Sequence, residues 1–297
     1  MKRFKNILVG VDLSYGDRLV SDRVGDPTQQ AIDTAIAVAK VSGAELCFVY
    51  TLDVDAATER LIEEQGEGES TVVDQADKAL GKIVAMVNEK GITASARVNI
   101  GRSWQKIIQV VQNFGHDLVI VGTREPGPIK RILMGTTAMR LLRRCPCPVL
   151  VTKPKHEIVK SVLVAHDMTP VGALAAELAS SISELTGAEL HVMHALEQVG
   201  YQEVRHESVF AHHDEIRKQI ESDIAGREAS VHLTDDDPSQ AVLDAIEKYQ
   251  IDIVVMGTIA RAGFSALLIG NTAERILPQL SCSVLAVKPE GFESGIE

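Results

Sequence analysis

The chain contains the segment Asp117-Leu-Val-Ile-Val-Gly-Thr123 twice, the second time as Asp252-Ile-Val-Val-Met-Gly-Thr258. Further on, Cys147-Pro-Val-Leu-Val-Thr-Lys-Pro154 returns as Cys282-Ser-Val-Leu-Ala-Val-Lys-Pro289, and the separations 252 − 117 and 282 − 147 are both 135. An internal repeat at a constant offset indicates one folding unit that is present twice. We therefore predict two domains, at residues 1–154 and 160–289.

The starts of the two copies also match, with Ile7-Leu-Val-Gly-Val-Asp12 corresponding to Val162-Leu-Val-Ala-His-Asp167. These segments are 155 residues apart (167 − 12), whereas Gly43 and Gly187, in the next matching segments, are 144 apart (187 − 43). The difference, 155 − 144 = 11, means that the first copy carries about eleven extra residues after its first strand.

Composition narrows the possible functions. The 297 residues suit two domains of about 150 residues each. The formal charge is −11 and no run of Lys or Arg is present, which disfavours binding to nucleic acid, because phosphate neutralisation supplies most of the non-specific affinity. No apolar stretch is long enough to span a membrane, and the first residues lead directly into a strand. We expect a cytoplasmic protein that binds neither nucleic acid nor a membrane.

Each copy alternates short apolar runs with segments of helical spacing. Glu45–Tyr50 is typical of a strand, and Ala31–Ala39 has the spacing of a helix. This alternation predicts an α/β fold, with a parallel sheet, right-handed crossovers and helices on both faces. The continuous apolar run Leu118–Val121 indicates a strand that is buried on both sides.

Ligands of such sheets bind at the carboxyl ends of the strands, where the strand order reverses. Glycines allow a ligand to approach the backbone, and free N–H groups at a helix start attract phosphate. An equally compatible interpretation is that the glycines only make turns and the threonines only cap helices. The candidate ligand-binding residues are Asp12, Gly122, Thr123, Gly135, Thr136 and Thr137 in the first copy and Asp167, Gly257, Thr258, Gly270, Asn271 and Thr272 in the second.

At these residues the chain resembles the universal stress protein family, whose nucleotide-binding members carry Gly-x-x-Gly, nine residues, and then Gly-Ser/Thr. The spacing fits Gly122 and Gly135 in the first copy, and Gly257 and Gly270 in the second. The segment Gly257-Thr-Ile-Ala-Arg-Ala-Gly-Phe-Ser-Ala-Leu-Leu-Ile-Gly-Asn-Thr-Ala-Glu274 is most similar to the tandem, E-type members.

The resemblance implies a five-stranded, Rossmann-like (adenine nucleotide alpha hydrolase-like) sheet in each half. It also implies an intramolecular pseudo-dimer that pairs through the last strands, Val149–Thr152 and Val284–Val287. The resemblance does not decide whether two such chains also form a homodimer. The implied ligand is ATP or AMP, and no metal is expected except magnesium that accompanies a nucleotide.

Both copies depart from the family's nucleotide-binding motif. Glu125 replaces the second glycine of the first copy, and a carboxylate about 4 Å from a phosphate costs ~1 kcal/mol even in water. The second copy has Ala260 there, Asn271 in place of Ser/Thr, and Asp235-Asp-Asp237 where the first has Ile100-Gly-Arg102. One of these aspartates could instead cap the helix that begins at Pro238. We therefore predict that nucleotide binding is weak or confined to one half.

Histidines lie close to the second site in the sequence. His166 and His194 end neighbouring strands beside Asp167, where they either line the crevice or pack. The sequence contains no Gly-x-Ser-x-Gly elbow and no Gly-x-x-x-x-Gly-Lys-Ser/Thr loop.

We therefore expect a non-enzymatic ligand-binding protein of the stress response with protein partners that the sequence does not identify. One alternative is a slow ATPase or autophosphorylating protein, with Thr136 or Thr137 receiving the phosphate. The other is a carrier of an apolar metabolite.

Overall fold

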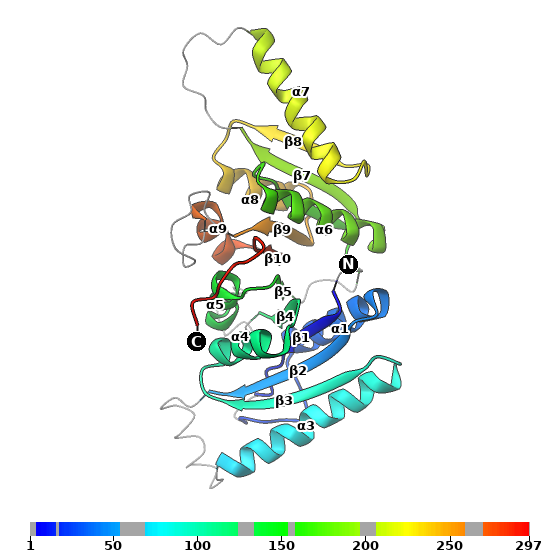
Figure 1. Cartoon of the computed structure of the whole chain (residues 1–297), viewed down its shortest axis with the longest axis vertical. Helices are drawn as coiled ribbons and strands as arrows, with labels where there is room; N and C mark the ends of the chain where they lie inside the picture. The colour runs from blue at the N-terminus through cyan, green and yellow to red at the C-terminus, as the bar shows by residue number, and fades with distance from the viewer. Residues whose placement is uncertain are drawn as a thin grey trace. The chain divides into compact units, whose positions relative to one another are not determined.

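The computed structural model describes residues 4–15, 18–53, 69–123, 134–153, 158–196, 206–258 and 270–296. It divides into two compact units, of which unit 1 is Met1–Pro154 with Phe292–Glu297 and unit 2 is Lys155–Gly291. Each unit is an α/β structure with a parallel sheet and helices on both faces, which confirms the predicted fold class (Figure 1).

The sheet of unit 1 has the strand order β3-β2-β1-β4-β5, and these neighbouring strands all run parallel. Leu8 and Ile120 have no exposed surface, because helices cover the strands on both sides. The elements of unit 1 are β1 (Asn6–Gly10), α1 (Asp26–Ser42), β2 (Glu45–Leu52), α3 (Glu69–Glu89), β3 (Ala94–Ile100), α4 (Ser103–Phe114), β4 (Leu118–Gly122), α5 (Thr136–Arg144) and β5 (Val149–Thr152).

Unit 2 repeats this topology with the strand order β10-β9-β6-β7-β8, again all parallel. Its elements are β6 (Ser161–Ala165), α6 (Pro170–Thr186), β7 (Glu189–Ala195), α7 (His206–Asp223), β8 (Ser230–Thr234), α8 (Pro238–Lys248), β9 (Ile253–Gly257), α9 (Asn271–Ile276), the 3-10 turn η1 (Leu277–Gln279) and β10 (Ser283–Val287).

The aspartate that opens the repeated segment has a structural role that the sequence did not indicate. Asp117 accepts hydrogen bonds from the backbone N–H groups of Lys5 and Asn6, at 2.6 and 3.1 Å. Asp252 does the same for Lys160 and Ser161, at 2.8 and 3.3 Å. In each unit, therefore, the side chain before the fourth strand holds the start of the first strand, which borders the point where the strand order reverses.

Candidate functional site

Unit 1 has a cavity of about 490 Å³ at the carboxyl ends of β1, β2 and β4, bordered by the starts of α4 and α5. This is where the strand order reverses and where a ligand is expected in an open α/β sheet. Its lining includes Asp12, Leu19, Tyr50, Thr51, Asp53, Ser103, Thr123, Gly135, Thr136 and Thr137.

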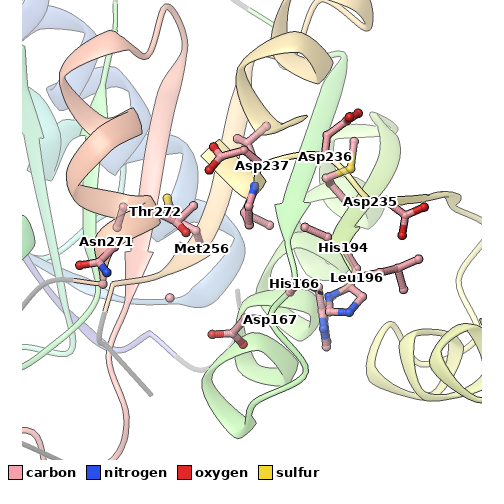
Figure 2. Close-up of a pocket in the computed structure, with 18 residues that line it drawn as sticks. His166, Asp167, His194, Leu196, Asp235, Asp236, Asp237, Met256, Asn271 and Thr272 are labelled. Carbon is pink, nitrogen blue, oxygen red and sulfur yellow. Dashed lines mark hydrogen bonds between the residues drawn. The ribbon is translucent and has the colours of Figure 1, made fainter. Parts of the chain in front are cut away.

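Unit 2 has a larger cavity, of about 680 Å³, at the corresponding edge. Figure 2 shows Asn271 and Thr272 on one side of it, and His166 and His194 on the opposite side. Asp167 and the three consecutive aspartates Asp235–Asp237 complete the polar part of the lining, which also includes Met193, Leu196, Val242 and Met256.

The structure brings most of the predicted site residues to these two cavities. In unit 1 all six line the cavity, and in unit 2 five of the six do. Thr258 is not among the lining residues of unit 2, because it is fully buried and its hydroxyl accepts a hydrogen bond from the ammonium group of Lys288.

The first glycine of each motif has a packing role. A Cβ atom on Gly122 would lie 2.4 Å from the carbonyl oxygen of Pro27, at the start of α1, and one on Gly257 would lie 3.0 Å from a methyl group of Val171 in α6. Contacts this short force the backbone or the side chain to move. Helix packing therefore restricts both positions whether or not a ligand binds, and it does so more strictly at Gly122 than at Gly257.

Three side chains of unit 1 lie in one row along the edge of the sheet. Gly10 pairs with Val49 and Val121, and the residues two positions later, Asp12, Thr51 and Thr123, all line the cavity. The hydroxyl oxygens of Thr51 and Thr123 are buried, and neither has a hydrogen-bond partner among the residues that the structure describes. Asp12 lies between them.

The same row in unit 2 is formed by Ala195, Asp167 and Thr258, because Ala165 pairs with Met193 and Met256. Ala195 has no hydroxyl, and that of Thr258 is bonded to Lys288. The Asp167 carboxylate accepts from the N–H and the hydroxyl of Thr169, at 3.1 and 2.5 Å. The two rows thus share a central carboxylate and differ on both sides of it.

The helices that follow the fourth strands begin at the cavities. The N-cap residues are Gly135 for α5 and Gly270 for α9. No side-chain hydrogen bond caps the first turn of either helix. The interpretation that Thr136 and Thr137 cap α5 is therefore wrong. The first N–H groups of a helix have no partner within the helix, so those of α5 are available to a ligand in the cavity.

The starts of α4 and α8 carry opposite charges. Arg102 is the N-cap of α4. The corresponding residue of α8, Asp237, accepts hydrogen bonds from the N–H groups of Ser239 and Gln240, at 3.0 and 3.2 Å, which confirms the capping interpretation. Asp237 also pairs with Arg275 at 2.8 Å, and this hydrogen bond holds the pKa of its carboxyl below the usual value.

The insertion in the first copy contributes to the cavity of unit 1, which the sequence did not indicate. Leu19 belongs to this insertion and lines the cavity, and its carbonyl oxygen accepts a hydrogen bond from the Tyr50 hydroxyl at 3.1 Å. Burial, reinforced by the nearby charge of Asp12, raises the pKa of Tyr50 well above its ordinary value, so the hydroxyl remains a donor. The counterpart of Tyr50 in the second copy is His194, which lies 144 residues later, as Gly187 lies 144 residues after Gly43.

His166 and His194 both line the cavity of unit 2. His194 donates its Nδ1–H to the carbonyl of His166 at 2.8 Å. His166 accepts the N–H of Met168 at Nδ1, so its Nε2 carries the proton that faces Asp223 at 3.1 Å. Burial lowers the pKa of His166 although Asp223 opposes the shift, which favours the neutral ring at pH 7.

The profile of the universal stress protein family matches residues 3–153 and again 159–288. The chain belongs to the universal stress protein family. Universal stress protein E of Photorhabdus laumondii is 25% identical over 321 aligned positions, which cover 100% of this chain and 99% of the relative. Universal stress protein E of Escherichia coli K12 is 27% identical over 66% of this chain and 68% of its own length. The chain is therefore a tandem universal stress protein of the E type.

Two solved structures have the same fold over nearly the whole chain. One is a protein of Pseudomonas aeruginosa PAO1 described as functionally unknown, with a TM-score of 0.74 and 24% identity over 97% of this chain and 94% of that one. The other is a universal stress protein of Archaeoglobus fulgidus, with a TM-score of 0.67 and 21% identity over 96% and 99% of the two chains. These similarities support the fold of this universal stress protein.

Some predictions about the family motif fall on residues 124–133 and 259–269, including Glu125 and Ala260, which lie outside the described residues. Within the described ranges, no group of three or more His, Cys, Asp or Glu side chains is arranged to hold a metal ion. The described helices also include none that is long and apolar enough to cross a membrane.

Proposed function

We propose that this universal stress protein is a non-enzymatic, cytoplasmic protein that binds a small ligand. Unit 1 binds ATP or AMP weakly, with a phosphate group at the start of α5 and magnesium only as the companion of the nucleotide, and unit 2 does not bind phosphate. The observation that carries this proposal is the difference in charge at the two cavities. The limits of the two domains, 1–154 and 160–289, remain part of the proposal and agree with the two family matches.

The charged side chains that line the cavity repel an anion less in unit 1 than in unit 2. The carboxylates that line its cavity are Asp12 and Asp53, and Asp53 accepts a hydrogen bond from the Ser103 hydroxyl at 3.3 Å. The cavity of unit 2 is lined by Asp167 and by Asp235–Asp237. Like charges about 4 Å apart repel by ~1 kcal/mol in water and by more where water is excluded. A phosphate group in unit 2 would therefore meet more repulsion.

Matched substitutions at the two helix starts test this assignment. Thr136 and Asn271 are the first residues of α5 and α9, and both are exposed. Thr136→Asp puts a carboxylate at the expected phosphate position and should weaken ATP and AMP binding about fivefold, while the added charge suits the helix start. Asn271→Asp should leave the affinity unchanged. Isothermal titration calorimetry of both variants and the wild type measures this.

Two results would contradict the proposal. Micromolar binding of ATP at two equivalent sites per chain would show that both units accept phosphate. Covalent phosphate on Thr136 or Thr137 after incubation with ATP and magnesium, detected by mass spectrometry, would show an autophosphorylating enzyme instead of a binding protein.

A second candidate function, a carrier of an apolar metabolite, is favoured by the cavity of unit 2. This cavity is the larger of the two and includes the side chains of Met193, Leu196, Val242 and Met256. Native mass spectrometry of the freshly purified protein tests it, because a carrier retains an apolar molecule that organic extraction releases. Val242→Asp should abolish that retention, whereas a carrier site in unit 1 would be insensitive to this substitution.

A further inference from the structure

Two histidine rings and a tyrosine ring lie together in unit 2, outside the lining of its cavity. His191 and His232, which we call the histidine pair, form a hydrogen bond of 3.2 Å between Nδ1 of the first and Nε2 of the second. The Tyr249 ring stacks on both, with centroids 4.7 and 4.6 Å away, and its hydroxyl lies 3.4 Å from His232 Nδ1. The proposed ligand sites use none of these three side chains.

The contact between the two imidazoles has room for one proton. An N–H···N hydrogen bond needs one nitrogen that carries a proton and one that does not. A neutral histidine pair meets this condition, and so does a pair with one additional proton on Nε2 of His191. When both rings are charged, both facing nitrogens carry protons, and the positive rings, with centroids 5.5 Å apart, repel each other. The histidine pair therefore stays together with one charged ring and separates with two.

The surrounding charges oppose the second proton. His191 is 5% exposed, and its Nε2 has no hydrogen-bond partner within the part of the chain that the structure describes, although the Glu189 carboxylate lies 3.8 Å away and favours a proton there. Burial lowers the pKa of His191, an effect that Glu189 opposes. Burial also lowers the pKa of His232, and the positive charges of His191, Lys248 and Arg217 lower it further. The first proton is therefore expected on His191, and the second costs more.

Helix α8 connects the histidine pair to the cavity. Tyr249 is the C-cap of α8, whose first residue, Pro238, lines the cavity together with Val242 in the second turn. The 11 residues of this helix span about 16 Å. α8 packs against β7, in which His191 and Met193 point to the same face, and Met193 also lines the cavity (Figure 1). A movement of one end of α8 therefore displaces the other end at the cavity.

We propose that the histidine pair is an acid-operated latch that controls the cavity of unit 2 through α8. While a single proton lies between the rings, Tyr249 stacks on both of them and the end of α8 stays in place. A proton on each ring breaks the hydrogen bond, the rings separate, and α8 moves away from β7, which opens the cavity. The latch does not depend on the proposed function, because it acts on the cavity whichever ligand binds there.

Unit 1 has a different arrangement at the same place. The counterparts of the three rings, 144 residues earlier for His191 and 135 for the other two, are Cys47, Arg97 and Phe114. The guanidinium carbon of Arg97 lies 3.6 Å from the centre of the Phe114 ring. Arginine keeps its charge at every pH at which the protein is folded, so this contact does not respond to acid. α4, the helix that ends at Phe114, therefore serves as an internal reference for α8.

Hydrogen exchange of the full chain, measured by mass spectrometry from pH 8 to pH 4.5 and corrected for the intrinsic effect of pH, tests the latch. The pKa values of both histidines are lowered, so the latch is intact above them and is lost as the pH falls through them. We expect the protection of α8 to fall by about tenfold or more, because each pKa unit of lowering corresponds to a factor of ten. α4 should keep its protection.

Two substitutions separate the histidine pair from other buried histidines. His232→Gln keeps an amide that can hydrogen-bond to His191 but takes up no proton, so α8 should keep its protection at low pH. The matched control is His116→Gln in unit 1, because His116 is also buried and its pKa is also lowered by burial. This control should leave the acid response of α8 as it is in the wild type.

Two exposed substitutions test the sign of the effect and leave both imidazoles in place. Glu189 attracts a proton to His191, so Glu189→Gln should move the loss of α8 protection to lower pH. Lys248 repels a proton from His232, so Lys248→Gln should move it to higher pH. Each shift should be a few tenths of a pH unit, because exposed charges interact weakly.

Three results would overturn the inference. If α8 of His232→Gln loses protection as the wild type does, the histidine pair does not hold the helix. If the wild-type loss is confined to the last turn of α8 and does not reach Val242, the latch does not control the cavity. If Glu189→Gln and Lys248→Gln shift the loss in the same direction, the protons that cause it bind elsewhere.

Discussion

The row of side chains at the carboxyl edge differs between the two units although the strand order that carries it is the same. In unit 2, Thr258 is bonded to Lys288. In unit 1, Lys153 occupies the corresponding position and is 4% exposed, yet Thr123 has no partner among the described residues. The comparison teaches that a duplicated sheet can keep its strand order in both copies while the threonine of this row is bonded within the protein in only one of them.

The largest expected effect concerns the packing that the units share. Gly122→Ala would put a methyl group 2.4 Å from the Pro27 carbonyl, and Gly257→Ala would put one 3.0 Å from the Val171 side chain, which can shift. We expect the first to lower the free energy of unfolding by about 3 kcal/mol and the second by about 1 kcal/mol. Urea denaturation measures both. Equal effects would mean that the two helices pack alike against the glycines.

The next effect is the response of each unit to acid. In unit 2, burial is the largest cause that lowers the pKa values of His166, His191 and His232. Among the described residues of unit 1, only His116 has a lowered histidine pKa, and burial is again the largest cause. A histidine whose pKa falls on folding stabilises the protein above its unfolded pKa of about 6.5, and this contribution is lost as the pH falls through the folded pKa. Unit 2 should therefore lose more stability than unit 1 between pH 7 and pH 5.

Hydrogen exchange with mass spectrometry, corrected for the intrinsic effect of pH, reports this loss separately for each unit. His232→Gln should reduce the acid response of unit 2. A similar loss of protection in both units would contradict the comparison.

A smaller effect is expected at the two threonines of the row. Thr258→Val removes one hydrogen bond from the buried ammonium group of Lys288 and should lower stability by about 2 kcal/mol, because bonds to charged groups are the stronger ones. Thr123→Val removes a hydroxyl that has no partner among the described residues and should leave stability unchanged or raise it. Thermal unfolding without ligand compares the two variants. Equal destabilisation would show that Thr123 is satisfied within the protein.

The smallest effect concerns the residues that follow Asp12 and Asp167. Ser14 and Thr169 each bond to the preceding aspartate, but only Thr169 also caps a helix, by accepting the N–H of Gly172 at 3.1 Å. Thr169→Ala should therefore cost about 1 kcal/mol, and Ser14→Ala only a few tenths. Chemical denaturation of the two variants is the measurement, and a larger loss from Ser14→Ala would reverse this part of the comparison.

The elements of the fold were predictable because their patterns are local. The limits of β5, Val149–Thr152, were predicted at the residues where the structure has them, and Pro148 and Pro154 bracket this apolar run in the sequence. β2 continues to Leu52 instead of ending at Tyr50, because it pairs with β3 as far as Ile100. That extension depends on a neighbouring strand, so the local pattern does not contain it.

The site was predictable only in outline. The motif spacing led to residues that line both cavities, but the role of Gly122 depends on Pro27, 122 − 27 = 95 residues earlier, and that contact exists only in the folded chain. For the same reason, the bond from Lys288 to Thr258 was not foreseen, and Thr258, which was predicted at a ligand site, does not line the cavity.

The close contact between Gly122 and Pro27 also has a consequence for evolution and engineering. Selection for stability alone is enough to retain this glycine, and packing against Val171 restricts Gly257 more weakly. The first glycine of the signature is therefore a poor marker of nucleotide binding in related sequences, since packing restricts it in both units. Attempts to introduce phosphate binding into unit 2 should begin with Asn271 and the aspartates before α8, where substitutions are not constrained by the packing of α6.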